Sequence, residues 1–121
     1  MFETEEEATQ EAGLALSLMK GKGWKIQVWH NLGWCFAIYN GPVSIYPSMS
    51  QDGKVEYWAQ ISDEIPEDGT RAIGSPAFWT PSKTGYFYDP NAAVVDALMN
   101  AEYFVSDCQD VIDFVRKAMK E

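Results

Sequence analysis

The chain has 121 residues, of which 46% are hydrophobic and 14% aromatic, and its 18 acidic against 9 basic side chains give a formal net charge of -9. This length suits one domain with a sizeable core, so we predict a single domain over residues 1–121 and little disorder. The negative charge disfavours direct binding of nucleic acid or of an anionic membrane, and it favours a basic protein partner.

The N-terminal stretch is acidic where a secretory signal would be basic and then apolar. No apolar run approaches the roughly 20 residues that a membrane span needs. The two cysteines, Cys35 and Cys108, both lie in apolar sequence, which is typical of reduced, buried thiols. We therefore expect a cytoplasmic protein.

The first predicted element is a helix over residues 4–20. Thr4 and Glu7 have the spacing of a capping box, and apolar side chains then recur at helical intervals until the sequence KGKG. These positions are Ala8, Ala12, Ala15, Leu16 and Met19.

Four strands follow, because the apolar period changes to two from Trp24 onward. The segments 24–31, 34–39, 43–47 and 54–61 alternate and are separated by NLG, by NG at 40–41 and by QDGK. The NG pair is a strong hairpin signal, and Pro47 is predicted to end the third strand. These features predict an antiparallel meander.

Residues 62–91 have no clear period, and a structureless loop of this length is unusual in a compact domain. We expect one or two short strands there, around 77–80 and 85–88. After Asp89-Pro90 the helical period returns as a heptad seam over residues 94–119. One long helix would favour a homodimer through this seam. The capping-box spacing of Ser106 and Gln109 favours two helices instead, and the predicted fold class is α+β.

The sequence from Val28 to Pro47 holds the only histidine, His30, five residues before Cys35. A zinc site needs about four ligands, and this chain has one histidine and two cysteines in all. Strand alternation also places Cys35 on the face of Ala37 and Tyr39. We interpret the stretch as sheet, predict no metal and no cofactor, and expect a protein that is not an enzyme.

Surface features carry the functional prediction. Alternation puts Trp29, Tyr39, Tyr46 and Trp58 on the sheet face opposite the one that the helices cover, and aromatic side chains are frequent anchors in protein interfaces. The alternative is that the N-terminal helix or the long loop folds over this second face as a further core layer. We predict partner-binding residues on this face and in the acidic loop: Trp29, Tyr46, Trp58, Asp63, Glu64, Glu67, Asp68 and Trp79.

A second hypothesis is a small-molecule or nucleotide-binding module with a pocket under the 62–91 loop. Its predicted ligand-binding residues are Arg71, Trp79, Lys83 and Tyr88, which together would clamp an aromatic anion.

The segments VWHNLGW at 28–34, GPVSIYPS at 41–48 and DPNAAV at 89–94 resemble small uncharacterised proteins encoded by bacteriophages and related mobile elements. The order of elements is also similar to that of double-stranded RNA-binding domains, but the final helical segment begins DPNAAVVDAL without their basic residues. The phage resemblance implies a bacterial host cytoplasm. It favours an inhibitor that binds a basic, nucleic-acid-handling host or defence protein stoichiometrically.

Overall fold

The computed structural model describes residues 2–62, 65, 85–104 and 109–120, with the backbone course alone for residues 101–104. Its elements follow the chain as α1 (Glu5–Leu18), β1 (Lys25–His30), β2 (Trp34–Asn40), β3 (Val43–Met49), β4 (Val55–Ile61), α2 (Pro90–Phe104) and α3 (Gln109–Ala118). The strands form one antiparallel sheet in the order β1-β2-β3-β4. The predicted α+β class and meander are confirmed, and the C-terminal segment forms two helices.

The start of α1 is fixed by the predicted capping box. The Glu7 N–H donates to Thr4 Oγ1 at 3.1 Å, and the Thr4 hydroxyl donates to Glu7 Oε1 at 3.2 Å. These bonds satisfy a free amide of the first turn. The buried face of α1 consists of Ala8, Ala12 and Ala15, whose small side chains let the helix lie close to the sheet.

The start of α2 is tied to the end of α1. Asp89 Oδ1 accepts the Asn91 N–H at 2.9 Å, and Pro90 takes the first helical position, where its missing N–H costs nothing. The Asn91 side chain donates from Nδ2 to the Leu18 carbonyl at 2.7 Å and accepts the Lys20 N–H at 2.9 Å. The Asn91 side chain therefore joins the end of α1 and the residues after it to the first turn of α2.

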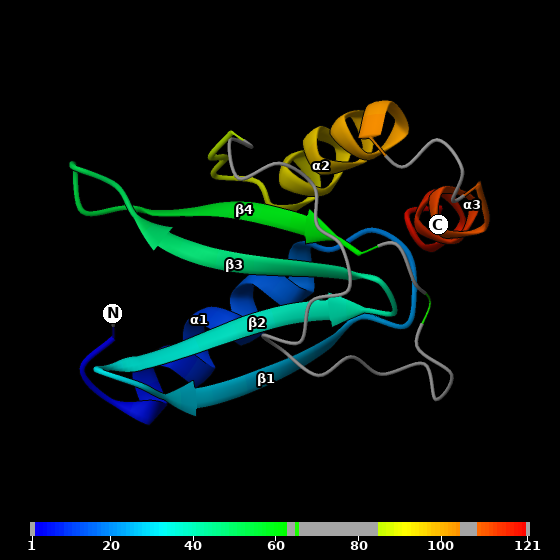
Figure 1. Cartoon of the computed structure of the whole chain (residues 1–121). Coiled ribbons are helices and arrows are strands. Elements are labelled where there is room, and N and C mark those ends of the chain that lie inside the picture. Colours follow the sequence, from blue (N-terminus) through cyan, green and yellow to red (C-terminus); the bar gives the residue numbers. More distant parts are fainter. Residues whose placement is uncertain (1, 63–64, 66–84, 105–108, 121) are drawn as a thin grey trace.

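One face of the sheet carries the core. α1 packs against β1 and β2, and α2 packs against β4 and β3 on the same face (Figure 1). The strand residues that contribute to this core alternate along each strand as the period of two predicts, and they are Phe36, Ile38, Val43, Ile45, Tyr57, Ala59 and Ile61.

Pro47 does not end its strand, so that prediction is wrong: β3 runs on to Met49. Tyr57, opposite Pro47 on β4, exchanges backbone hydrogen bonds of 2.6 and 2.9 Å with Phe87 on its other side. In an antiparallel pair this orientation turns the Pro47 nitrogen toward β2. Because proline has no N–H, it interrupts the ladder to β2, and the pairing of β2 with β3 ends at Ile45.

The β2–β3 hairpin is confirmed, but its loop is one residue later than the NG signal. Asn40 pairs with Val43, so Gly41 and Pro42 form the two-residue loop, with Gly41 at φ 56°. A Cβ at Gly41 would lie 2.7 Å from Phe114 Cε1. Glycine thus permits both the turn and the packing of α3 against it.

The heptad seam of the C-terminal segment contributes residues to the core of this chain. Val94, Ile112 and Val115 are buried, and the seam positions 101, 105 and 108, like the capping residue Ser106, lie outside the part described for side chains. A homodimer through this seam stays a prediction. None of the helices, searched over the described residues, is long and apolar enough to cross a membrane.

Candidate binding hollow beside the β3–β4 turn

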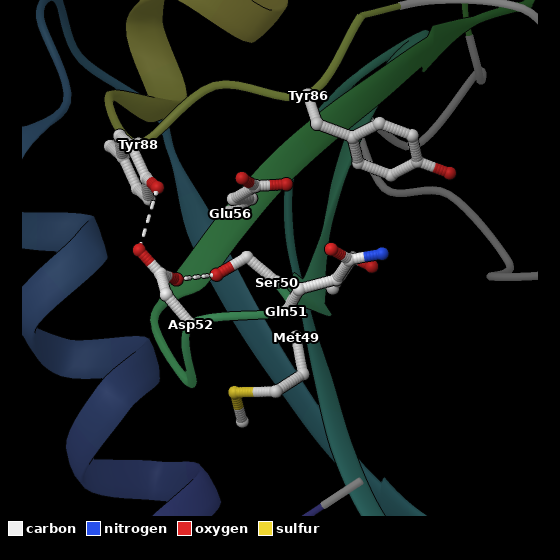
Figure 2. Close-up of a pocket in the computed structure, with 8 residues that line it drawn as sticks. Met49, Ser50, Gln51, Asp52, Glu56, Tyr86 and Tyr88 are labelled. Carbon is white, nitrogen blue, oxygen red and sulfur yellow. Dashed lines mark hydrogen bonds between the residues drawn. The ribbon is translucent and has the colours of Figure 1, made fainter.

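A hollow of about 550 Å³ lies where the β3–β4 turn meets the chain segment that leads into α2. We call it the Tyr88 hollow, and Figure 2 shows its lining side chains. The lining combines two carboxylates, two phenols, three uncharged polar side chains and one methionine. These residues are Ser48, Met49, Ser50, Gln51, Asp52, Glu56, Tyr86 and Tyr88.

The turn on one side of the hollow is held by its own polar groups. The Ser50 N–H donates to the Lys54 carbonyl at 2.8 Å, and Gly53 adopts φ 82°, a conformation that glycine accepts without strain. Asp52 accepts hydrogen bonds from the Ser50 hydroxyl and from the Lys54 N–H. The carboxylate of Asp52 is therefore fixed at the rim.

The tyrosines on the other side are placed by a single backbone bridge. Phe87 pairs antiparallel with Tyr57 at the outer edge of β4, so the short strand expected at 85–88 is reduced to one bridge. Alternation then points Phe87 toward the core and turns Tyr86 and Tyr88 to the opposite side. Each of these two tyrosines is 57% exposed.

Tyr57, which forms this bridge, is expected to make the stability of the protein depend on pH. Its side chain is 4% exposed, and burial together with the charge of Glu11 raises the pKa of Tyr57 from 10.0 to about 12. The Tyr57 hydroxyl therefore loses its proton near pH 10 in the unfolded chain but keeps it there in the folded chain. The contribution of Tyr57 to the free energy of unfolding is thus complete below pH 10 and is lost as pH rises through 12.

We expect the stability advantage of the parent over Tyr57→Phe to shrink between these two pH values. Urea unfolding of both proteins from pH 8 upward measures the difference. A constant difference across this range would contradict the assignment, and the difference below pH 10 serves as the internal reference.

The electrostatics of the hollow are those of a cation site. Hydrogen bonds from Ser50 and from the Lys54 backbone lower the pKa of Asp52, so its carboxylate is ionised at neutral pH. Desolvation, followed by the charges of Asp52 and Glu56, raises the pKa of Tyr88, which stays a neutral phenol. The Tyr88 hydroxyl donates to Asp52 Oδ2 at 3.4 Å (Figure 2).

One cation of the chain already uses this aromatic surface. The Lys54 ammonium lies 5.7 Å from the centre of the Tyr88 ring, within the range of a cation–π interaction. The ring and the two carboxylates together can therefore bind an ammonium or a guanidinium group.

The second face of the sheet continues from this hollow. Tyr46 and Trp58 are cross-strand partners, their rings stack at 4.8 Å between centroids, and the neighbouring pair on the same face is Ser48 and Glu56. Trp29 lies on the same face but on β1, beyond the point where β2 and β3 separate. The prediction that these aromatic residues oppose the helix-covered face is confirmed.

The aromatic residues of the second sheet face are less exposed than they would be if that face were open to solvent. Trp29, Tyr46 and Trp58 are half-buried, and Ala37 and Ser44 on the same face are buried. The N-terminal helix does not cover this face, because α1 lies in the core on the other side. The other part of that alternative, a cover formed by the long loop, falls on residues that lie largely outside the described ones. Among the described residues, the exposed tyrosine rings are those of Tyr86 and Tyr88.

Several predicted site residues lie outside the described residues. These are the acidic-loop positions Asp63, Glu64, Glu67 and Asp68, the aromatic Trp79, and the ligand-binding candidates Arg71 and Lys83, together with the strand expected at 77–80. Tyr88 is described, and its charged neighbours are the carboxylates of Asp52 and Glu56 and the ammonium group of Lys54. Because the other three residues of the predicted clamp lie outside the described residues, the binding of an aromatic anion stays a prediction.

His30 and Cys35 do not form a reactive pair. Trp29 faces Cys35 and His30 faces Trp34 in the β1–β2 register, so His30 and Cys35 point to opposite faces of the sheet. Burial raises the pKa of the Cys35 thiol, which keeps it protonated. Within residues 2–62, 65, 85–104 and 109–120 no three His, Cys, Asp or Glu side chains cluster as metal ligands.

Asp52, Glu56 and Tyr86 were not predicted as site residues. Asp52 belongs to a turn, Glu56 to a strand, and Tyr86 to a segment without a period. The alternation of GYFYD at 85–89 was the available signal, since it places Tyr86 and Tyr88 on one side. Comparison with protein-family models, with curated proteins and with solved structures finds no match, so the hollow is interpreted from its own geometry.

Proposed function

We propose that this chain is a non-enzymatic binding protein that takes a basic protein partner, with a lysine or arginine side chain of that partner seated in the Tyr88 hollow. The observation that carries the proposal is the meeting of two carboxylates, Asp52 and Glu56, with two exposed tyrosine rings in one hollow. Carboxylates pair with ammonium and guanidinium groups, and aromatic faces attract the same cations.

The rest of the molecule supports the same partner chemistry. A net charge of -9 attracts a basic surface from a distance and raises the rate of encounter. Tyrosine is also among the residues most often found as binding anchors, because its ring gives a large contact area with few rotatable bonds. Encounter would depend on the overall charge, while the lifetime of the complex would depend on the hollow.

The partner class follows from this chemistry. Proteins that handle nucleic acids present clustered lysine and arginine side chains for phosphates, and a protein with an acidic, tyrosine-lined hollow competes for such a cluster. We propose stoichiometric inhibition of a nucleic-acid-handling host or defence protein as the mode of action.

The test uses a tetra-arginine peptide as the probe and isothermal titration calorimetry as the measurement. We expect the double variant Asp52→Asn, Glu56→Gln to weaken binding about tenfold, because two charge-assisted contacts are lost. The matched control is Asp110→Asn, Asp113→Asn, which changes the net charge equally but lies on α3, at the other end of the sheet from the β3–β4 turn (Figure 1).

The control is expected to change the affinity by less than about twofold, since exposed charges far from a bound cation are screened. Equal weakening in both double variants would overturn the proposal, because the peptide would then respond to net charge alone. Tyr88→Ala is expected to accelerate dissociation of the same peptide, and surface plasmon resonance measures this rate.

A further inference from the structure

A second cavity, of about 600 Å³, lies at the C-terminal end of α3 and has the opposite electrostatic character. Its lining residues are Lys22, Asn40, Phe114, Lys117, Ala118 and Lys120. Three of the nine basic side chains of the whole chain are thus gathered around one cavity, with no carboxylate among the described lining residues. We call it the lysine pocket.

The lysine pocket and the Tyr88 hollow are at opposite ends of the sheet. α3 stands beside the β2–β3 turn, whereas the β3–β4 turn that forms the hollow projects from the other end (Figure 1). The chain is therefore polarised, with a local cationic site on a molecule of net negative charge.

The walls of the lysine pocket are fixed by close backbone packing. The Asn40 side chain donates from Nδ2 to the Lys22 carbonyl at 3.0 Å, which ties the segment before β1 to the end of β2. Gly21 lies so close to α3 that a Cβ there would be 1.5 Å from the Ala118 carbonyl oxygen. The lysines thus extend from two segments, the stretch before β1 and the C-terminal end of α3, whose backbones are already held together.

Ordinary structural roles explain only part of this arrangement. Lys117 lies in the last turn of α3, where a positive charge complements the helix dipole. Lys22 and Lys120 come from outside the helix, and all three side chains are exposed. None of the three ammonium groups has an ion-pair partner within the part of the chain that the structure describes.

Three ammonium groups around one cavity repel one another, and an anion in the cavity would remove that repulsion. Lysine is a common ligand of phosphate groups, to which it donates as a point charge. The cavity volume falls within the range typical of small-molecule sites. The ring of Phe114 supplies an apolar wall beside the charges.

We propose that the lysine pocket binds the pyrophosphate group of a small molecule, with Lys22, Lys117 and Lys120 as its ligands. A polyvalent anion suits this pocket because its several oxygens can pair with the three ammonium groups at once. The source of the group is either free pyrophosphate or a nucleotide whose base lies along Phe114. This site is independent of the Tyr88 hollow and of the partner proposed for it.

The experiment titrates sodium pyrophosphate and ADP separately into the full chain and follows binding by calorimetry. We expect a Kd below about 1 mM for at least one of them, with affinity that falls as salt increases. An affinity for pyrophosphate equal to or higher than that for ADP would identify the free group as the source, and tighter binding of ADP would identify a nucleotide. Either result supports the pyrophosphate site.

The variants Lys22→Ala, Lys117→Ala and Lys120→Ala are each expected to weaken binding about tenfold, because each removes one charge-assisted contact. Lys25→Ala is the matched control, since Lys25 is exposed on β1 and does not line the pocket. Circular dichroism verifies that each variant is folded.

Two outcomes would overturn the proposal. One is the absence of binding by both pyrophosphate and ADP at concentrations of about 1 mM. The other is equal weakening by Lys25→Ala and by the pocket variants. The tetra-arginine titration of the parent is unaffected by either outcome, so failure here is distinguishable from failure of the proposed function.

Discussion

Phe36→Ala is expected to lower the free energy of unfolding by about 3–5 kcal/mol. Phe36 is fully buried, and its ring lies 5.8 Å from that of Phe2 and 6.4 Å from that of Tyr57. It fills the core at the point where β2 and β3 separate, beyond their last pair at Ile45. The truncation would remove these contacts and leave a cavity that the diverging strands are poorly placed to close.

Urea unfolding at neutral pH measures this loss, which is large against a typical domain stability of about 5–15 kcal/mol. Leu14→Ala is the matched control, because Leu14 is 57% exposed on α1. We expect the control to cost less than about 1 kcal/mol. A loss for Phe36→Ala no greater than that of the control would contradict the packing of Phe2 and Tyr57 on this ring.

The faces of the sheet followed from the sequence because a strand has a strict period of two. Alternation alone places Phe36 and Ile38 on one face of the sheet and Cys35 and Ala37 on the other, independently of any tertiary contact. The start of α1 was predictable for the same reason, because Thr4 and Glu7, which cap the helix, lie within one turn of each other.

The role of Pro47 was not accessible to the same reasoning. A proline in a strand is compatible with an end, an edge or a bulge. The choice depends on Phe87, forty residues later, which bonds to Tyr57 and so determines which neighbour the Pro47 nitrogen faces. A tertiary contact therefore decides what a local signal means.

Both candidate sites depend on such contacts. Asp52 and Tyr88 are separated by 36 residues and meet only because of the Tyr57–Phe87 bridge. Lys22 and Lys117 are farther apart along the chain and are brought together by the packing of α3. Each of these side chains, taken alone in the sequence, is an ordinary charged residue of a turn or a helix end.

The packing of α3 can be tested at Gly21. Gly21→Ala is expected to destabilise the protein by about 3 kcal/mol, because two penalties add. Gly21 has φ 86°, where a side chain is strained, and its new Cβ would lie 1.5 Å from the Ala118 carbonyl oxygen. This oxygen belongs to the backbone, so the clash is relieved only if the end of α3 moves away.

Gly53→Ala separates the two penalties. Gly53 has a similar φ of 82°, but a Cβ there would meet nothing within 4 Å. The strain alone is expected to cost about 1 kcal/mol, so urea unfolding should place Gly21→Ala well below Gly53→Ala in stability. Equal losses would contradict the close contact of Gly21 with α3. If the contact is present, its loss also moves Lys117 and Lys120 away from Lys22, and pyrophosphate binding should weaken in Gly21→Ala but not in Gly53→Ala.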